Sequence, residues 1–580
     1  MRRFTYALLA LFLCAAGARA QNVPVQEVVL DNGLRVLMVP RKGDPNIAAG
    51  WITRTGSVNE RPGITGLSHL FEHMMFKGTR TVGTKNIDEN LKVLKEMDDV
   101  RAQIRAEEKD LIRRARLGEV ADVKDPQFRS EKHKQLLARF DELTKREKEL
   151  MVKDEFDRIY TTAGASGMNA GTSNDFTVYF INVPANKLEL WYWMESDRLL
   201  NPVFREFYSE RDVVHEERRL RTDSTPTGKF DEQFEAMFWM SSPYGWPVVG
   251  WPSDLEGITR EEALDYFAVN YAPNNLTAAL VGDFEPARAT ELAKKYFGRL
   301  SRGPREPEPV RTQEMQQLAE QRMVAYAETS PQVRVRYHTV ADGNSDDYAL
   351  GVLGDLLNGR TGRLYKSLVL QQEVANNAFA GQNGNKYEGY FELRGVAKPG
   401  KSPEDVEQAL YKEIEKLQKE PVPADELQKI KNQSAADQFR GLQSNFGLMV
   451  QLLLRDANRG WATINTDPAR IQAITPADIQ RVANKYFTPE NRTVGIYRTK
   501  AAGAGGAAED ATLAGLSDQE KAQIQRLRAM LPQMKAEQVR GILQMVEQQA
   551  GSAPADKQKG IQLVKKMLED RLKQLEGGTK

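Results

Sequence analysis

Residues 258–277, ITREEALDYFAVNYAPNNLT, decide the fold because their pattern returns in residues 474–493, ITPADIQRVANKYFTPENRT. Both stretches run from Ile-Thr through an amphipathic helical segment and an aromatic residue to a Pro-x-Asn-x-Thr motif. An apolar, strand-like segment follows each copy, AALVGDF after the first and VGIYRT after the second. A match of this length indicates two homologous α/β domains, each ending in the same helix–turn–strand unit. We therefore expect the α+β fold class.

Changes in composition predict the other boundaries of the chain. SRGPREPEPVRT (301–312) is rich in Pro, Arg and Glu and predicts a linker. It separates an N-terminal domain, residues 21–300, from a C-terminal domain, residues 313–500. The small residues of AAGAGGAAEDATLAG predict a flexible linker at 501–516, which leads to a helical tail at 517–580.

Residues 86–158 differ from the rest of the first domain because Lys, Arg, Asp and Glu dominate them. Apolar side chains recur at helical spacing on both sides of a breaker region, LGEVADVKDPQF; they are Val93, Met97, Val100, Ile104 and Leu111, then Leu136, Phe140, Leu143 and Leu150. This spacing predicts two long amphipathic helices that form an antiparallel hairpin inserted into the first domain. The alternative is a solvated helical spacer without a specific role.

The first twenty residues, MRRFTYALLALFLCAAGARA, have the layout of a signal peptide, with cleavage expected after Ala20. The apolar core is shorter than the roughly 20 residues of a membrane span, which argues against an uncleaved anchor. A lipoprotein box ending at Cys14 is a further alternative, although Leu13 fits it poorly. Cys14 is the only cysteine, so the mature chain has no disulfides. We expect an exported protein, periplasmic or extracellular, without a membrane span after signal cleavage.

The bulk composition excludes some classes of partner. The chain has 580 residues, 41% of them hydrophobic. This length exceeds what one hydrophobic core usually supports. The 81 basic and 80 acidic side chains are balanced. Such a balance creates no field that recruits nucleic acid or an anionic membrane.

The sequence HLFEH places two of the five histidines of the chain four residues apart. On a helix His69 and His73 share one face, and Glu72 lies next to that face. This is the inverted zinc-peptidase motif, H-x-x-E-H, in which two imidazoles and a distant carboxylate hold zinc. Glu72 can then take the proton of a metal-bound water. The alternative is a pair of histidines on a helix surface beside a chance glutamate.

A third ligand is expected in the stretch EFYSERDVVHEERRLRTD. On a helix, Glu217 shares a face with Val213 and Leu220, and a carboxylate in such an apolar stripe must be paired or bind metal. Glu216 is the rival and points away by about 100°. His215 is a weaker rival.

Four segments in this order resemble the inverzincin metallopeptidases, which include pitrilysin, insulin-degrading enzyme and the mitochondrial processing peptidase. They are LDNGLRVLMVP, GSVNERPGITGLSHLFEHMMFKGT, MNAGTSNDFTVYFINVP and ERDVVHEER. The resemblance extends over residues 25–500 and implies two homologous domains of the processing-peptidase type.

The resemblance also implies the residues of the site. It assigns the zinc (Zn2+) ligands to His69, His73 and Glu217, the general base to Glu72, and a supporting carboxylate to Glu210 in the catalytic centre.

Substrate binding is implied by the same resemblance. Asn169 and Ala170 match an Asn-Ala pair on an edge strand, whose backbone pairs with an extended substrate. Pairing of this kind suits unfolded peptides. From the residues alone, an Asn among glycines, as in GASGMNAGTSND, predicts a turn.

The chain departs from the family pattern at two places. The spacing from His73 to the distant glutamate is longer than in the family, and the predicted hairpin accounts for the excess. Active members also need an arginine and a tyrosine from the second domain of the opposing half, which bind the scissile carbonyl. The matching stretch, GRLYKSLVLQQEVANNAFA, has Val369 and Asn376 at these positions, with Arg363 and Tyr365 as nearby substitutes.

This second departure implies the zinc-bearing half of a heterodimer, in which a related subunit carries the Arg/Tyr pair. A homodimer that uses a substitute group is the alternative. The sequence thus predicts an exported zinc-dependent endopeptidase that cleaves unfolded peptides. Two alternatives belong to other classes: a non-catalytic scaffold subunit with the same fold, and a binding module built on the hairpin and the tail.

Overall fold

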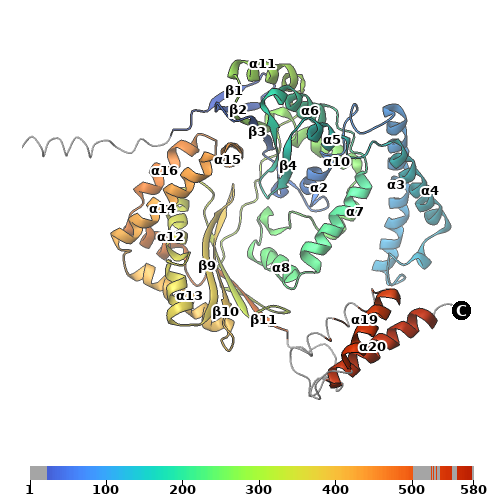
Figure 1. The fold of residues 1–580 in the computed structure, drawn as a ribbon. Helices are drawn as coiled ribbons and strands as arrows, with labels where there is room; N and C mark the ends of the chain where they lie inside the picture. The colour runs from blue at the N-terminus through green and yellow to red at the C-terminus, as the bar shows by residue number, and fades with distance from the viewer. Residues whose placement is uncertain are drawn as a thin grey trace, which may run out of the picture. The chain divides into compact units, whose positions relative to one another are not determined.

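The computed structural model describes residues 22–500, 536–550 and 558–577, and also Ile524, Leu527, Leu531 and Met534. The predicted signal peptide and the predicted linker at 501–516 lie outside the described residues. The chain divides into two compact units, residues 1–498 and 499–580. Helices combine with two separate sheets (Figure 1), so the predicted α+β class is confirmed.

The first sheet contains six strands: β1 (Gln26–Val29), β2 (Arg35–Pro40), β3 (Asn46–Thr53), β4 (Ser166–Thr172), β5 (Thr177–Pro184) and β6 (Leu276–Gly282). Their order is β1-β2-β6-β3-β5-β4, and only the β2–β6 pair is parallel. The Asp-Asn-Gly turn between β1 and β2 places Gly33 at a φ of 93°, which favours glycine. All seven residues of β6 are buried because the strand is central and covered on both faces.

The second sheet contains five strands: β7 (Gln321–Ala327), β8 (Gln332–Thr339), β9 (Ala375–Gly384), β10 (Gly389–Ala397) and β11 (Arg492–Thr499). Their order is β7-β11-β8-β10-β9. The repeated sequence precedes the last strand of each sheet: helix α10 (Arg260–Asn270) leads to β6, and helix α17 (Pro476–Tyr486) leads to β11. The threonine of each copy, Thr259 or Thr475, caps its helix through a capping box.

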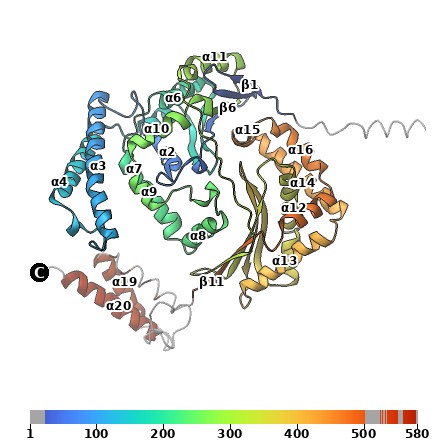
Figure 2. The ribbon, with the colours of Figure 1, turned by 180° about the vertical axis from the view of Figure 1, so that it is seen from behind.

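On one face of each sheet, a group of helices buries a separate hydrophobic core. On the first sheet these are α2 (Leu67–Met74), α6 (Leu188–Leu200), α10 and α11 (Pro286–Tyr296). On the second sheet they are α12 (Ser345–Leu357), α13 (Pro403–Lys419) and α17. Figure 2 shows the same layers from behind.

Helix α15 (Asn445–Asn458) joins the two halves of the chain. In sequence it lies between α13 and α17 of the second half, yet it packs on β3 and β6 of the first sheet. Leu448, Met449, Leu452 and Leu453 of α15 share a hydrophobic core with strands β2, β3 and β6. Asp456 at its end lies 2.6 Å from Arg54 Nη2 and receives a hydrogen bond from Thr277 Oγ1 at 2.6 Å.

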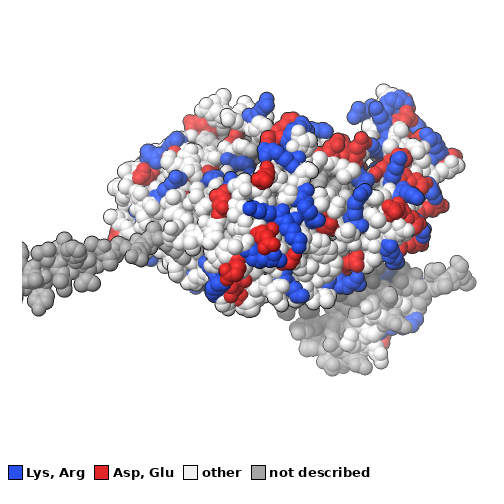
Figure 3. All heavy atoms as spheres, turned by 90° about the horizontal axis from the view of Figure 1, so that it is seen from above, with Lys and Arg blue, Asp and Glu red and all other residues white. Residues whose placement is uncertain are grey.

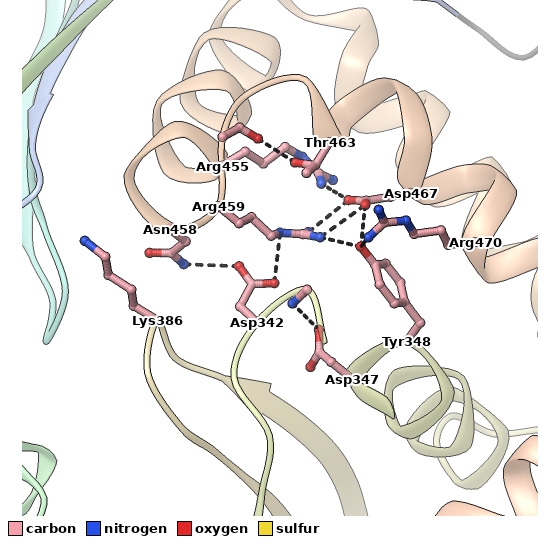
Figure 4. A network of polar contacts seen from close by, with 12 residues as sticks. Asp342, Asp347, Tyr348, Lys386, Arg455, Asn458, Arg459, Thr463, Asp467 and Arg470 are labelled. Carbon is pink, nitrogen blue, oxygen red and sulfur yellow. Dashed lines mark hydrogen bonds and ion pairs between the residues drawn. The ribbon is translucent and has the colours of Figure 1, made fainter. Parts of the chain in front are cut away.

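A polar network fixes α15 to the second half (Figure 4). Arg459 lies between Asp342 and Asp467, with Nε 3.0 Å from Asp342 Oδ1 and Nη2 2.9 Å from Asp467 Oδ2. Tyr348 of α12 donates its hydroxyl to Asp467 at 2.7 Å. Because Asp467 lies in α16 (Thr463–Ala473), the network holds three helices together.

The charged insertion forms two helices, α3 (Ile87–Arg116) and α4 (Glu131–Leu150), which pack against each other. Asn86 and Ser130 cap them through side-chain oxygens. The apolar side chains that set the helical spacing are mostly buried between them, and ion pairs such as Arg139–Glu96 at 2.6 Å cross the outer surface. Figure 3 shows basic and acidic side chains interspersed over this hairpin.

The first unit also contains further α-helices. They are α5 (Glu155–Thr162), α7 (Phe207–Arg218), α8 (Gly228–Phe238), α9 (Pro252–Gly257) and α14 (Ala424–Gln443). In the second unit, α19 (Ala536–Ala550) and α20 (Gln558–Gly577) pack through Val539 and Leu568. Among the residues that the structure describes, no helix is long and apolar enough to cross a membrane.

Candidate metal centre

Helix α2 has one face buried in the core, and its opposite face presents the polar residues of HLFEH to a cavity. Leu67, Leu70, Phe71 and Met74 pack into the first core. Glu60 begins the helix by accepting the backbone N–H groups of Gly66 at 2.8 Å and Ser68 at 2.6 Å. Burial raises the pKa of Glu60 to about 8, and the two N–H donors act in the opposite direction.

His69, His73 and Glu217 offer ligand atoms that all lie within 4.8 Å of one another. Glu217 belongs to α7, which packs beside α2. Its Oε2 is 3.5 Å from His69 Nε2 and 3.4 Å from His73 Nε2. Within residues 22–500 and the described parts of the tail, no other group of His, Cys, Asp and Glu has this arrangement.

The two distances from Glu217 to the histidines fit a tetrahedral zinc ion. Zinc bonds to imidazole nitrogen and carboxylate oxygen are about 2.0–2.2 Å long, which separates neighbouring ligand atoms by about 3.4 Å. The carboxylate oxygen and the imidazole nitrogens are too far apart to form ordinary hydrogen bonds with each other. Two imidazoles and one carboxylate leave a fourth position for water or substrate.

The surroundings of the two histidines shift their pKa values in opposite directions. Burial lowers the pKa of His69. Burial also acts to lower the pKa of His73, but the hydrogen bond and the charge of Glu210 raise it above the usual value.

Glu210 lies behind His73 and contacts its other ring nitrogen. Glu210 Oε2 is 3.3 Å from His73 Nδ1, and Oε1 is 2.5 Å from Lys77 Nζ. Burial acts to raise the pKa of Glu210, but the hydrogen bonds from His73 and Lys77 lower it, so the carboxylate is ionised. A carboxylate at the far nitrogen fixes the orientation of a metal-binding histidine. Glu210 thus orients the His73 ring and is not among the residues that line the cavity beside His69 and Glu72.

Glu72 contacts a residue that the sequence analysis missed. Thr172 of β4 donates its hydroxyl to Glu72 Oε2 at 2.7 Å. This bond leaves Glu72 Oε1 as the oxygen available to a water in the cavity. The signal that points to Thr172 is the alternation of side chains along a strand, which places it on the same face as Ala170.

Glu217 reaches the site for a different reason from the one expected. Val213 is 46% exposed and Leu220 is 61% exposed, so the predicted buried apolar stripe around Glu217 is wrong. The buried face of α7 instead contains Phe207, Tyr208, Glu210, Arg211, Val214 and Arg218. Leu220 lies seven residues after Val213 and so on the same exposed side, in the π-helical turn Arg219–Asp223 that continues the helix.

Side-chain contacts distinguish Glu217 from Glu216 and His215, the two other candidates for the third ligand. Arg221 Nη1 lies 2.6 Å from Glu217 Oε1, which turns Oε2 toward the two histidines. Glu216 pairs with Arg219 at 2.9 Å on the exposed side. His215 is half-buried, and its Nε2 has no hydrogen-bond partner among the described residues.

The edge strand β4 forms one wall of the same cavity. It pairs with β5 alone, with Asn169 opposite Phe180 and Ala170 opposite Tyr179. Asn169 therefore lies in a strand, and the turn predicted for it from the residues alone is wrong. The cavity has a volume of about 450 Å³, and its lining includes His69, Glu72, Asn169, Ala170, Thr172 and Glu217.

The second half offers no equivalent pair of donors at the predicted positions. Val369 lies in a π-helical turn, Tyr365–Gln371, and Asn376 donates its side-chain amide to Ala397 O at 3.3 Å. Arg363 is held by both carboxylate oxygens of Glu426, at 3.1 and 2.6 Å. These residues do not line the metal cavity.

Comparison with known proteins identifies the family. The family model "Insulinase (Peptidase family M16)" matches residues 35–99, which include all of α2, and "Peptidase M16 inactive domain" matches residues 257–434. The chain belongs to the M16 peptidase family. Within M16, the zinc protease PqqE of Helicobacter pylori is 28% identical over 496 residues, which are 83% of this chain and 95% of PqqE.

Other M16 proteins are similar over different lengths. The probable mitochondrial-processing peptidase subunit beta of Arabidopsis thaliana is 24% identical over 338 residues, 55% of this chain and 62% of that protein. The crystal structure of a protease from Helicobacter pylori superposes with a TM-score of 0.67 at 24% identity, covering 82% of this chain and 100% of that chain. Zinc proteases are thus relatives of this M16 chain, and the two-half M16 fold is shared.

Proposed function

We propose that this chain is an exported zinc-dependent endopeptidase that cleaves unfolded peptides. The proposal rests on His69, His73 and Glu217, which each offer a ligand atom within 4.8 Å of the others. Glu72 and the edge strand β4 line the same cavity and so bring a base and a peptide-binding edge to the ligands. The signal-peptide layout of residues 1–20 supports export to the periplasm or the extracellular space.

The residues of the cavity have separate roles in this proposal. A bound Zn²⁺ would polarise a carbonyl and make a water acidic near neutral pH. Glu72 accepts the proton of the attacking water and later delivers it to the leaving amine. Thr172 holds the Glu72 carboxylate in one orientation, and Glu210 holds His73.

Strand β4 supports the choice of substrate class. In the part of the chain that the structure describes, its outer edge pairs with no other strand. An extended peptide can add to such an edge by main-chain hydrogen bonds, which select conformation more than side-chain identity. Asn169 and Ala170 are the residues proposed to bind the peptide, and a folded protein does not offer them a free strand.

Zinc analysis of the purified mature chain tests this function. We expect about one zinc per chain by elemental analysis, the stoichiometry of a single three-ligand site. Removing the metal with a chelator should abolish cleavage of an unfolded peptide, and adding zinc should restore it. A folded chain that neither contains zinc nor takes it up would contradict the proposal.

The zinc content also distinguishes the endopeptidase from the second candidate function, a non-catalytic scaffold subunit of a peptidase-like complex. Two observations favour it: the family model matched by residues 257–434 is described as inactive, and Val369 and Asn376 replace the donor pair. A scaffold does not need metal, so a zinc-loaded chain argues against this role.

We further propose a related subunit that carries the Arg/Tyr pair as a partner, giving a heterodimer. Arg363 is already paired with Glu426, which supports this over a homodimer. Mixing the chain with such a relative should raise the peptidase rate by about 10²–10³-fold, the effect of one carbonyl-binding donor, or more. The rate is measured with a quenched fluorescent peptide, and a relative lacking the pair is the control. Full activity of the purified chain alone would contradict the need for a partner.

A further inference from the structure

The helical hairpin α3–α4 contacts the segment that leads into α7, the helix that carries Glu210 and Glu217. Most of its side chains are charged and many are exposed, but Asn90 of α3 and Glu147 of α4 are buried. Buried polar groups need partners. The side-chain oxygens of Asn90 and Glu147 have their hydrogen-bond partners in residues 205–206.

Asn90 holds Arg205. Asn90 Oδ1 accepts a hydrogen bond from Arg205 Nε at 2.7 Å. The other nitrogens of this fully buried guanidinium donate to the backbone oxygens of Lys77 at 3.3 Å, Val82 at 3.1 Å and Thr79 at 2.6 Å. These oxygens belong to the segment that follows α2. Arg205 therefore connects the hairpin, the end of the histidine helix and the start of α7.

Glu147 forms a hydrogen bond with Glu206, the residue directly before α7. Its Oε1 accepts the backbone N–H of Glu206 at 2.8 Å. Phe204 and Glu206 have φ values of 54° and 57°, in the left-handed region that residues other than glycine rarely adopt. Such a conformation persists only where surrounding contacts impose it. Glu147 supplies one of these contacts from the hairpin.

The contacts continue from Glu206 to a metal ligand. Lys77 Nζ lies 3.1 Å from Glu206 Oε2 and 2.5 Å from Glu210 Oε1. Glu210 Oε2 in turn lies 3.3 Å from His73 Nδ1. An unbroken series of polar contacts thus runs from α4 of the hairpin to the imidazole of His73.

We propose that the hairpin positions α7, so that the zinc affinity of the centre depends on the acceptor oxygens of Glu147 and Asn90. Both are positioning residues, since neither lines the metal cavity. Their contacts fix where α7 begins and therefore where its carboxylates meet the histidines of α2. The inference rests on the proposed metal centre and gives the inserted hairpin a role in it.

Zinc affinity of the full mature chain, measured by competition with a chromophoric chelator, tests this role. Glu147→Leu removes the acceptor, and we expect zinc to bind about 10–100-fold more weakly, as when an outer partner of a metal ligand is lost. Glu147→Gln keeps an acceptor oxygen and should retain wild-type affinity. Glu142→Leu, at an exposed position of the same helix, is the matched control and should also bind zinc normally.

Wild-type zinc affinity in a folded Glu147→Leu chain would overturn the inference, and so would an equal loss in Glu147→Gln. If circular dichroism shows that Glu147→Leu is unfolded, the pair Asn90→Leu and Asn90→Asp decides, since only the aspartate keeps an acceptor for Arg205. A wild-type chain that binds no zinc would refute the metal centre itself. Zinc binding that is independent of both residues would refute the positioning role alone.

Discussion

Glu72→Gln is expected to abolish peptide cleavage while the chain keeps its zinc. Glutamine has nearly the same shape as glutamate and can still accept the hydrogen bond from Thr172, so the site should stay assembled. It cannot take a proton from water, and loss of a general base lowers rates by about 10²–10⁴-fold. The measurement pairs elemental zinc analysis with hydrolysis of a quenched fluorescent peptide, using whichever partner gives the wild type its activity.

Glu142→Gln is the matched control for this substitution. It makes the same chemical change at an exposed position of α4 and should leave both zinc and rate unchanged. Cleavage by Glu72→Gln at the wild-type rate would remove Glu72 from the base role. Loss of zinc together with activity would instead assign Glu72 to holding the metal.

Glu217→Gln is expected to remove zinc from the chain. The carboxylate supplies the only oxygen ligand and the only formal negative charge among the three ligand groups. Loss of a direct ligand should weaken binding beyond the 10–100-fold that is typical for an outer partner. Chelator competition gives the zinc affinity, and circular dichroism confirms that α7 is still folded.

The neighbouring residue provides the control. Glu216→Gln changes the same group one position earlier, where the side chain is exposed and paired with Arg219. We expect it to bind zinc as the wild type does. If the two variants lose zinc equally, the effect comes from the helix and not from a ligand at residue 217.

The two-sheet fold could be predicted because its signal is local and repeated. Thr259 and Thr475 begin equivalent helices, and each helix leads to the last strand of its sheet. HLFEH is also local, so helical spacing alone places His69 and His73 on one face. The edge position of β4 needed the family resemblance, since the glycines around Asn169 favour a turn.

The rest of the site depends on contacts that spacing does not encode. Glu217 lies beside the histidines although its expected apolar stripe is exposed, because Glu210 and Val214 form the buried face of α7. The bond between Thr172 and Glu72 joins a strand to a helix far from it in sequence. The contact of Glu147 with the Glu206 backbone is likewise created only when the hairpin folds onto its domain.

Helix α15 makes separation of the two halves of the chain costly. Its leucines share one core with the strands of the first sheet, and Asp456 is fully buried between the halves. Separating the halves would expose that core and leave a carboxylate without its arginines, which is costly. Helix α15 therefore holds the two halves together as strongly as the interior of either half is held.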